Sequence, residues 1–177
     1  MHYRNVCRIR MPDRLHPVEL SVMSNKPGRT NAAKRPPPTR TQLLPLSAAT
    51  VRTVSLRNHL ALLAMRNGYG SAEHISELIK TLYLTYFICD PNRFEPPVET
   101  YLAAEAILKA FIREPVAPDA WHIDDLRCKS IEAILCAHDT QLATTPLHRI
   151  TEARRRLDHS LKKGCFPDLQ AIHTPCR

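Results

Sequence analysis

The scarcity of glycine constrains the fold of this chain more than any other feature. Its 177 residues contain only Gly28, Gly68, Gly70 and Gly164. A β-sandwich needs glycine in its turns, and a doubly wound sheet needs it in the loops that hold phosphate. The shortage therefore favours helices, and a hydrophobic content of 44% is enough for one buried core.

Five segments with helical apolar spacing follow one another between residues 47 and 164. We predict that they form a single all-α domain, a bundle of about five helices. The first segment opens at the N-cap Ser47, bends around residues 53–55 and ends before Gly68. A single apolar stripe runs along it, made of Leu56, Leu60 and Leu63.

The second helix should be the central helix of the bundle. It is predicted over residues 72–89, with Ser71 as its N-cap. Its apolar residues point to every side, and such a helix is normally surrounded by others. Asp90-Pro91 ends it, because a proline disfavours the α conformation in the residue before it.

Three further helices are predicted over residues 96–114, 118–142 and 146–164, each marked by proline or glycine. The fourth helix of the bundle carries Trp121 in its first turn, as a packing anchor. Its apolar residues, Leu126 among them, spread over two faces, so we expect this helix to be largely buried.

The two ends of the chain are predicted to be tails. Residues 1–46 read as a disordered, basic, proline-rich segment, and residues 165–177 as a flexible C-terminal one. Residues 1–50 carry nine lysines and arginines against two acids, together with seven of the fifteen prolines. Such a segment serves either as a solubilising leader or as an arm for an acidic partner, and Met23 is an alternative start to Met1.

The predicted domain is polarised in charge. Residues 68–146 hold twelve acids against six bases, whereas the last helix holds six bases against two acids. The bases of the last helix are Arg149, Arg154, Arg155, Arg156, Lys162 and Lys163. A cationic face of this kind either is solvated or contacts an acidic protein or nucleic acid.

Motifs for catalysis or metal binding are missing from the sequence. It contains no C-x-x-C, H-E-x-x-H, G-x-S-x-G or phosphate-binding glycine loop. Cys165, His173 and Cys176 lie close together, but we favour a frayed C-terminus there over a zinc site. Cys89 and Cys136 stand among apolar neighbours and should be buried and inert. We therefore predict no catalytic residue, metal or cofactor, although a helical enzyme whose pocket only the fold assembles stays an alternative.

Three short stretches carry a family resemblance. Leu44–Ser47, Ser55–Leu62 and Tyr83–Phe87 resemble segments of short proteobacterial proteins, some of them loosely described as transcriptional regulators related to the factor for inversion stimulation. In that factor's family, DNA is read by a C-terminal helix-turn-helix whose last helix is rich in arginine and lysine. The resemblance implies a DNA-associated protein.

The last predicted helix also resembles that basic helix, in Ala153–Leu157 and Lys162–Gly164. It departs from the family pattern because the helix before it is long and ends in Thr144-Thr145-Pro146, where a helix-turn-helix has a short helix and a tight turn. We therefore transfer only the idea of DNA association and no base-reading residue.

Charge and resemblance together lead to a hypothesis of function. We expect a small, non-catalytic bacterial regulator or accessory protein that contacts nucleic acid through Lys34, Arg35 and Arg40 of the arm and through the six cations of the last helix. The alternative is a protein-interaction module that recognises a partner or pairs head to tail with a second copy. No apolar run reaches the ~18 residues of a membrane span and no secretory signal is evident, so a cytoplasmic location is expected.

Overall fold

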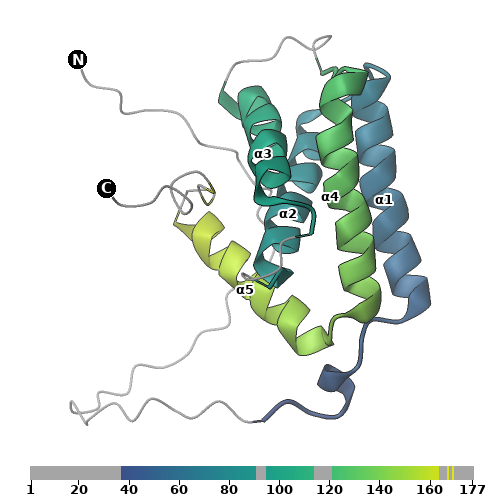
Figure 1. Ribbon diagram of the computed structural model, residues 1–177, viewed down its shortest axis with the longest axis vertical. Helices are drawn as coiled ribbons and strands as arrows, with labels where there is room; N and C mark the ends of the chain where they lie inside the picture. The colour runs from purple at the N-terminus through teal and green to yellow at the C-terminus, as the bar shows by residue number, and fades with distance from the viewer. Residues whose placement is uncertain (1–36, 91–94, 114–120, 164–166, 168, 170–177) are drawn as a thin grey trace, which may run out of the picture. The chain divides into compact units, whose positions relative to one another are not determined.

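The computed structural model describes residues 37–90, 95–113, 121–163, 167 and 169. These residues confirm the predicted all-α bundle of five helices (Figure 1). The elements are a 3₁₀ turn, η1 (Thr41–Leu43), and the helices α1 (Ala48–Arg66), α2 (Ala72–Ile88), α3 (Val98–Arg113), α4 (Asp125–Thr144) and α5 (Leu147–Lys162). All of them belong to one unit, Pro38–Arg177. The predicted tail up to residue 36, including Lys34 and Arg35, lies outside the described residues.

Helix α2 is the centre of the bundle, as predicted. It packs against α1, α3, α4 and α5 (Figure 1). Its buried side chains include Ile75, Leu78, Ile79, Leu82 and Tyr83, which point to several sides of the helix. A helix that is apolar on most of its circumference is stable only when it is surrounded in this way.

Local capping signals place the helix ends close to their predicted positions. The Ser47 hydroxyl accepts a hydrogen bond from the Thr50 amide at 3.2 Å, and Ser71 accepts one from the His74 amide at 3.4 Å. Gly68 adopts φ +77°, a conformation that side chains disfavour, directly after α1. These contacts satisfy helix-end amides and separate α1 from α2.

Helix α4 begins later than predicted, at Asp125 instead of near residue 118. Asp124 is its N-cap, because the Asp124 carboxylate accepts a hydrogen bond from the Arg127 amide at 2.9 Å. Trp121 therefore precedes the helix, where its ring stacks on Phe111 with 6.1 Å between ring centroids. The Ile123 amide donates to the Met65 carbonyl at 3.1 Å, which ties this irregular segment to the end of α1.

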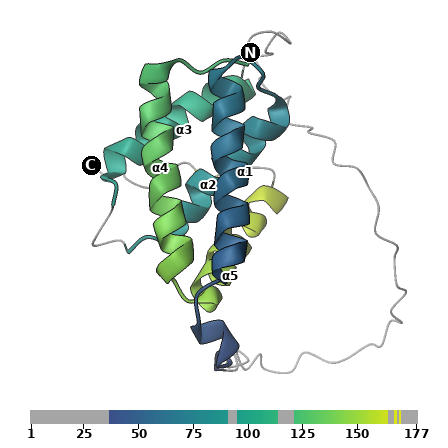
Figure 2. The same ribbon diagram turned by 90° about the vertical axis from the view of Figure 1, so that its right-hand side faces the viewer.

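Gly70 is required by close packing at the same place. A Cβ atom there would collide with the Met65 sulfur and with the Trp121 backbone carbonyl. Helices α1 and α4 lie side by side from this point on, as Figures 1 and 2 both show.

The apolar stripe of α1 faces away from the bundle, which the sequence did not indicate. Leu56, Leu60 and Leu63 are 61%, 52% and 48% exposed. The unbroken helix instead buries the opposite face, made of Asn58, Ala61, Leu62 and Met65. Leu126 at the start of α4, predicted to be buried, is also exposed.

The core continues beyond α5 into the predicted C-terminal tail. Leu169 is fully buried, and its amide donates to Oε1 of the buried Glu105 at 3.2 Å. The Tyr83 hydroxyl lies 2.8 Å from the same carboxylate oxygen and 2.7 Å from the Pro167 carbonyl. The described part of residues 165–177 is thus packed on α2 and α3.

Candidate nucleic-acid interface

Helix α5 is strongly amphipathic, with its cations on the outside. Ile150, Ala153 and Leu157 are buried against the bundle. All six basic residues singled out from the sequence are exposed. The structure thus confirms the exposure on which the predicted interface depends.

The 3₁₀ turn η1, which Arg40 directly precedes, docks on the start of α5 (Figures 1 and 2). The first amide of α5, on Leu147, donates to the Leu44 carbonyl at 2.9 Å. One residue on, Nδ1 of His148 lies 3.1 Å from the Gln42 carbonyl. Pro146 precedes α5 and offers no side-chain cap, so the backbone of the arm supplies the acceptor that the helix end needs.

This docking moves the boundary of the folded unit. The predicted tail ran to residue 46, whereas the unit begins at Pro38. Two segments that are far apart in sequence therefore meet at one end of the bundle. Sequence reasoning missed the contact because neither partner carries a motif for it.

The cations of α5 are not equivalent, because two of them serve the fold. Nη2 of Arg149 donates to the Ile88 carbonyl at the end of α2, at 3.4 Å. The Arg156 guanidinium lies over the Phe87 ring, 4.5 Å from its centroid. Both contacts hold α5 on α2, and they leave these two side chains less able to reach a ligand.

The remaining cations of α5 are more available. Arg155 forms an exposed ion pair with Glu152 at 3.1 Å, a contact that water and salt weaken. No ion pair is found for Arg154, Lys162 or Lys163 within the described ranges. Arg155 and Lys162, seven residues apart, share one flank of the helix about 10.5 Å from each other along its axis.

His138 is buried and adds no positive charge to this end of the bundle. Its Nδ1 lies 3.1 Å from the Thr85 hydroxyl, whose proton goes to the Thr81 carbonyl at 2.7 Å. Nδ1 is therefore the donor in this contact. The pKa of His138 is lowered from 6.5 to about 4, mainly by burial; Asp139 opposes the shift, and the charge of Arg154 adds to it. His138 is neutral at pH 7.

A serine, an aspartate and a histidine meet between α1 and α4. Oδ2 of Asp139 accepts from the Ser55 hydroxyl at 2.8 Å and lies 3.0 Å from Nε2 of His59. In a hydrolytic triad the histidine stands between serine and aspartate, because it must take the serine proton. Here the aspartate stands in the middle, so the arrangement links two helices and does not activate the serine.

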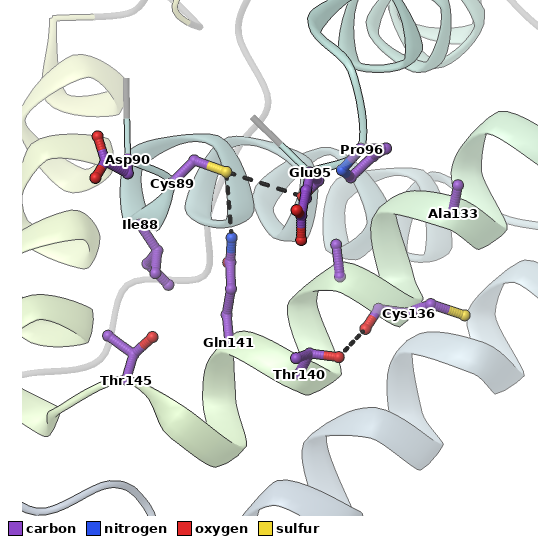
Figure 3. A pocket seen from close by; sticks show the side chains of 11 residues that line it. Ile88, Cys89, Asp90, Glu95, Pro96, Ala133, Cys136, Thr140, Gln141 and Thr145 are labelled. Atoms are coloured by element: carbon purple, nitrogen blue, oxygen red, sulfur yellow. Dashed lines mark hydrogen bonds between the residues drawn. The ribbon is translucent and has the colours of Figure 1, made fainter. Parts of the chain in front are cut away.

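A pocket of about 420 Å³ opens between the end of α2 and α4 (Figure 3). Gln141 reaches across it, and its Nε2 donates to Cys89 Sγ at 3.5 Å. Cys136 also lines the pocket and is exposed, so the prediction that it is buried is wrong. It lies on the outer side of α4, where sequence neighbours do not reveal which way a residue faces. The pocket lining includes Asp90 and Glu95 and no base, so it does not extend the cationic surface.

Metal ligands do not gather in the part of the chain that the structure describes: no group of three His, Cys, Asp or Glu side chains is placed to hold an ion. Cys165, His173 and Cys176 lie outside it. Within the same part of the chain, no helix has the length and apolarity that crossing a bilayer requires.

Searches against protein-family models, curated proteins and solved structures each found no match. The resemblance to proteins related to the factor for inversion stimulation therefore stays a prediction.

Proposed function

We propose that this protein is a non-catalytic nucleic-acid-associating protein that binds phosphates through the cationic end formed by η1 and α5. The observation that carries the proposal is the docking of the arm on α5 through the Leu44 carbonyl and the Leu147 amide. It brings η1, which Arg40 precedes, to the start of α5, the helix that carries Arg149, Arg154, Arg155, Arg156 and Lys162 on its exposed face.

The mechanism is neutralisation of phosphates. Lysines and arginines at a surface displace the cations condensed on nucleic acid, which gives affinity that falls steeply with salt and depends little on sequence. Arg40, Arg154, Arg155, Lys162 and Lys163 are the residues we assign to these contacts. Arg149 and Arg156 contribute to the local potential while holding α5 on α2.

Lys34 and Arg35, which precede Pro38 in the sequence, are further cations that we assign to phosphate contacts. Lys34 and Arg35 precede Arg40 by a few residues, so an arm that follows a nucleic-acid backbone would start from the docked segment. The full chain carries a net charge of +8, which favours association with any polyanion. Binding should therefore be broad in sequence preference.

The test is a fluorescence titration of the full chain with duplex DNA and single-stranded RNA between about 50 and about 200 mM salt. The double variant Arg154→Gln, Lys162→Gln removes two cations that have no ion pair in the described structure. We expect roughly tenfold weaker binding at the lowest salt, and a slope of log K against log salt that is smaller by about two.

The matched control is Arg127→Gln, Lys129→Gln, which removes the same charge from exposed positions near the start of α4. It should change affinity much less, because those positions lie far along α4 from its junction with α5. Equal losses in both variants would show a general charge effect and contradict the assigned surface. No binding at the lowest salt would refute the function.

A further inference from the structure

A short segment after α5 is held on the bundle as a bound peptide would be. Within it the structure describes Pro167 and Leu169. The Pro167 carbonyl lies 2.7 Å from the Tyr83 hydroxyl on α2, and the Leu169 amide donates to Oε1 of Glu105 on α3 at 3.2 Å. The Leu169 side chain is fully buried and belongs to the main apolar cluster of the bundle. Two backbone groups and one apolar side chain therefore hold this segment.

The surface that receives the segment is built by α2 and α3. Tyr83 is fully buried and Glu105 is 2% exposed, so packing fixes both side chains. Nζ of Lys109 lies 3.0 Å from Oε1 of Glu105, one helical turn away on α3. A buried carboxylate is costly unless it is paired, and here its charged partner does not belong to the segment. The charge of Glu105 is therefore balanced whether or not the segment is bound.

The hydroxyl proton of Tyr83 is available to the segment. Tyr83 lies 2.8 Å from Oε1 of Glu105 as well as 2.7 Å from the Pro167 carbonyl, and it has one proton for the two oxygens. Because the carboxylate oxygen also faces the Lys109 ammonium and the Leu169 amide, the hydroxyl proton can go to the Pro167 carbonyl. The surface thus offers one donor and one acceptor, which match a carbonyl and an amide two residues apart.

These contacts define the chemistry of a ligand. Backbone carbonyls and amides are common to every protein, so leucine is the side chain that the buried contact selects. Proline suits the position of the carbonyl, because its ring fixes φ and lowers the entropy that a segment loses on binding. The matching ligand is a segment in which leucine follows proline by two residues, written Pro-x-Leu below.

We propose that the α2–α3 surface around Tyr83 and Glu105 binds a Pro-x-Leu segment of another protein, and that the chain's own segment is an internal competitor for it. None of the three contacts requires the segment to be joined to α5. The receiving groups lie on two helices that already pack on each other. Release alone would leave an empty apolar site and an unpaired carbonyl, whereas an incoming segment restores the same contacts. Exchange of segments is therefore favoured over simple opening.

The tether between α5 and the segment sets the concentration that an outside ligand must reach. Residues 164–166 follow α5 and its C-cap Lys163, and a linker so short gives an effective concentration on the order of millimolar. One buried leucine with two hydrogen bonds supports a Kd for a free peptide on the order of 0.1 to 1 mM. The own segment should therefore fill most sites, and a partner needs a high local concentration or further contacts to displace it.

The first experiment weakens the internal competitor and supplies the ligand from outside. The full chain with Leu169→Ala is titrated with a peptide of residues 166–173 to about 2 mM, and amide chemical shifts of α2 and α3 in heteronuclear NMR spectra report binding. We expect a Kd on the order of 0.1 to 1 mM, and binding to the wild-type chain that is at least about fivefold weaker.

Two altered peptides test the ligand chemistry. A peptide with alanine in place of its leucine should bind at least about tenfold more weakly, because it lacks the buried side chain. A peptide that keeps only the proline and the leucine among glycines and serines should bind within about threefold of the original. The second result would show that a segment of another protein can satisfy the site.

A matched pair of tyrosine variants tests the receiving surface in the Leu169→Ala chain. Tyr83→Phe removes the hydroxyl that faces the Pro167 carbonyl and should weaken peptide binding by about three- to tenfold. The control Tyr69→Phe makes the same chemical change at a side chain that is 81% exposed, and it should leave binding unchanged. Circular dichroism and thermal unfolding verify that each variant is folded.

The wild-type chain provides a measurement that needs no variant. Exchange of the Leu169 amide hydrogen with solvent should be slow, because the residue is buried and its amide donates to Glu105. About 2 mM of the peptide should accelerate this exchange at least about twofold and leave exchange in α4 unchanged. If Leu169→Ala does not fold, this measurement decides the proposal.

Several outcomes would overturn the proposal. These are a folded Leu169→Ala chain that binds no peptide up to about 2 mM, binding that is indifferent to the leucine of the peptide, and equal effects of Tyr83→Phe and Tyr69→Phe. Unchanged exchange of the wild-type Leu169 amide counts in the same way. Wild-type dimers that the peptide dissociates would identify a second copy as the occupant and overturn the assignment to another protein. None of these readouts involves nucleic acid, so the result does not depend on the proposed function.

Discussion

Helices α1 and α5 both lie at the periphery of the bundle, but their outer faces differ in kind. The outer face of α1 carries exposed leucines, and that of α5 carries exposed arginines and lysines. Their inner faces differ as well, because α5 buries only apolar residues whereas α1 buries Asn58. A helix that keeps its leucines outside and one that keeps its cations outside present different surfaces to solvent, an apolar one on α1 and a cationic one on α5.

Truncating one leucine on each helix should give the largest difference between them. Leu157 on α5 is 3% exposed, so Leu157→Ala should lower the free energy of unfolding by about 3 kcal/mol through the cavity it leaves. Leu60→Ala on α1 removes an exposed side chain and should change it by less than about 0.5 kcal/mol.

Urea unfolding measures both values. A loss of more than about 2 kcal/mol for Leu60→Ala would show that the Leu60 side chain is packed inside the folded protein. That result would remove the contrast between the two helices.

Acid should lower the stability of the protein because His138 is buried. The pKa of His138 is about 4 in the folded protein instead of its ordinary 6.5, with burial as the main cause and Arg154 as a contributor. Between these two pH values the unfolded chain binds a proton that the folded chain does not, so stability falls as pH falls from 6.5 to 4. The loss from this group is at most about 3 kcal/mol, and no loss from it occurs above pH 6.5.

The measurement compares urea unfolding near pH 7 and near pH 4.5 for the wild type and for His138→Gln. The variant should lose less stability on acidification than the wild type, because it lacks the titrating group. Equal losses would mean that His138 titrates normally in the folded protein.

Replacing the buried amide of α1 should have the smallest effect, and a stabilising one. Asn58→Leu exchanges two unpaired polar atoms for methyl groups of similar arrangement, and we expect a gain of about 1 kcal/mol. Thermal unfolding at low protein concentration provides the readout. A destabilised variant would indicate that the Asn58 amide has a partner, such as a bound water molecule, and that α1 is less anomalous than it looks.

Local signals in the sequence predicted the elements of this fold well. Ser47, Ser71 and Gly68 act within one turn of the backbone, so their neighbours in sequence are enough to place a helix end. The start of α4 was misplaced because Pro118-Asp119 is also a plausible start. The choice of Asp124 depends on Ile123 pairing with Met65, far away in sequence.

Periodicity could not show which face of α1 packs against the rest of the bundle. The helix has two apolar stripes, one with Leu56, Leu60 and Leu63 and one with Ala61, Leu62 and Met65. The spacing analysis singled out only the first stripe, whereas packing against α2 and α4 buries the second one. The hydrogen bonds from Ser55 and His59 to Asp139 hold α1 against α4 in this orientation. They join residues that are 84 and 80 positions apart in the sequence.

The residues of the candidate interface could be predicted from the sequence, but the tertiary contacts that they make could not. The sequence alone shows how many cationic residues α5 carries and how they are spaced along the helix. The contacts of Arg149 with Ile88 and of Arg156 with Phe87, which divide the cations into two groups, need the tertiary structure.

The docking of η1 on α5 has a consequence for how the chain folds during synthesis. The contact between Gln42 and His148 joins residues 106 positions apart. At the ~5 to 20 residues per second of a ribosome, His148 is added about 5 to 20 seconds after Gln42. Throughout that time the Leu44 carbonyl lacks the Leu147 amide from which it accepts in the folded protein, and the segment docks only when the last helix has been made.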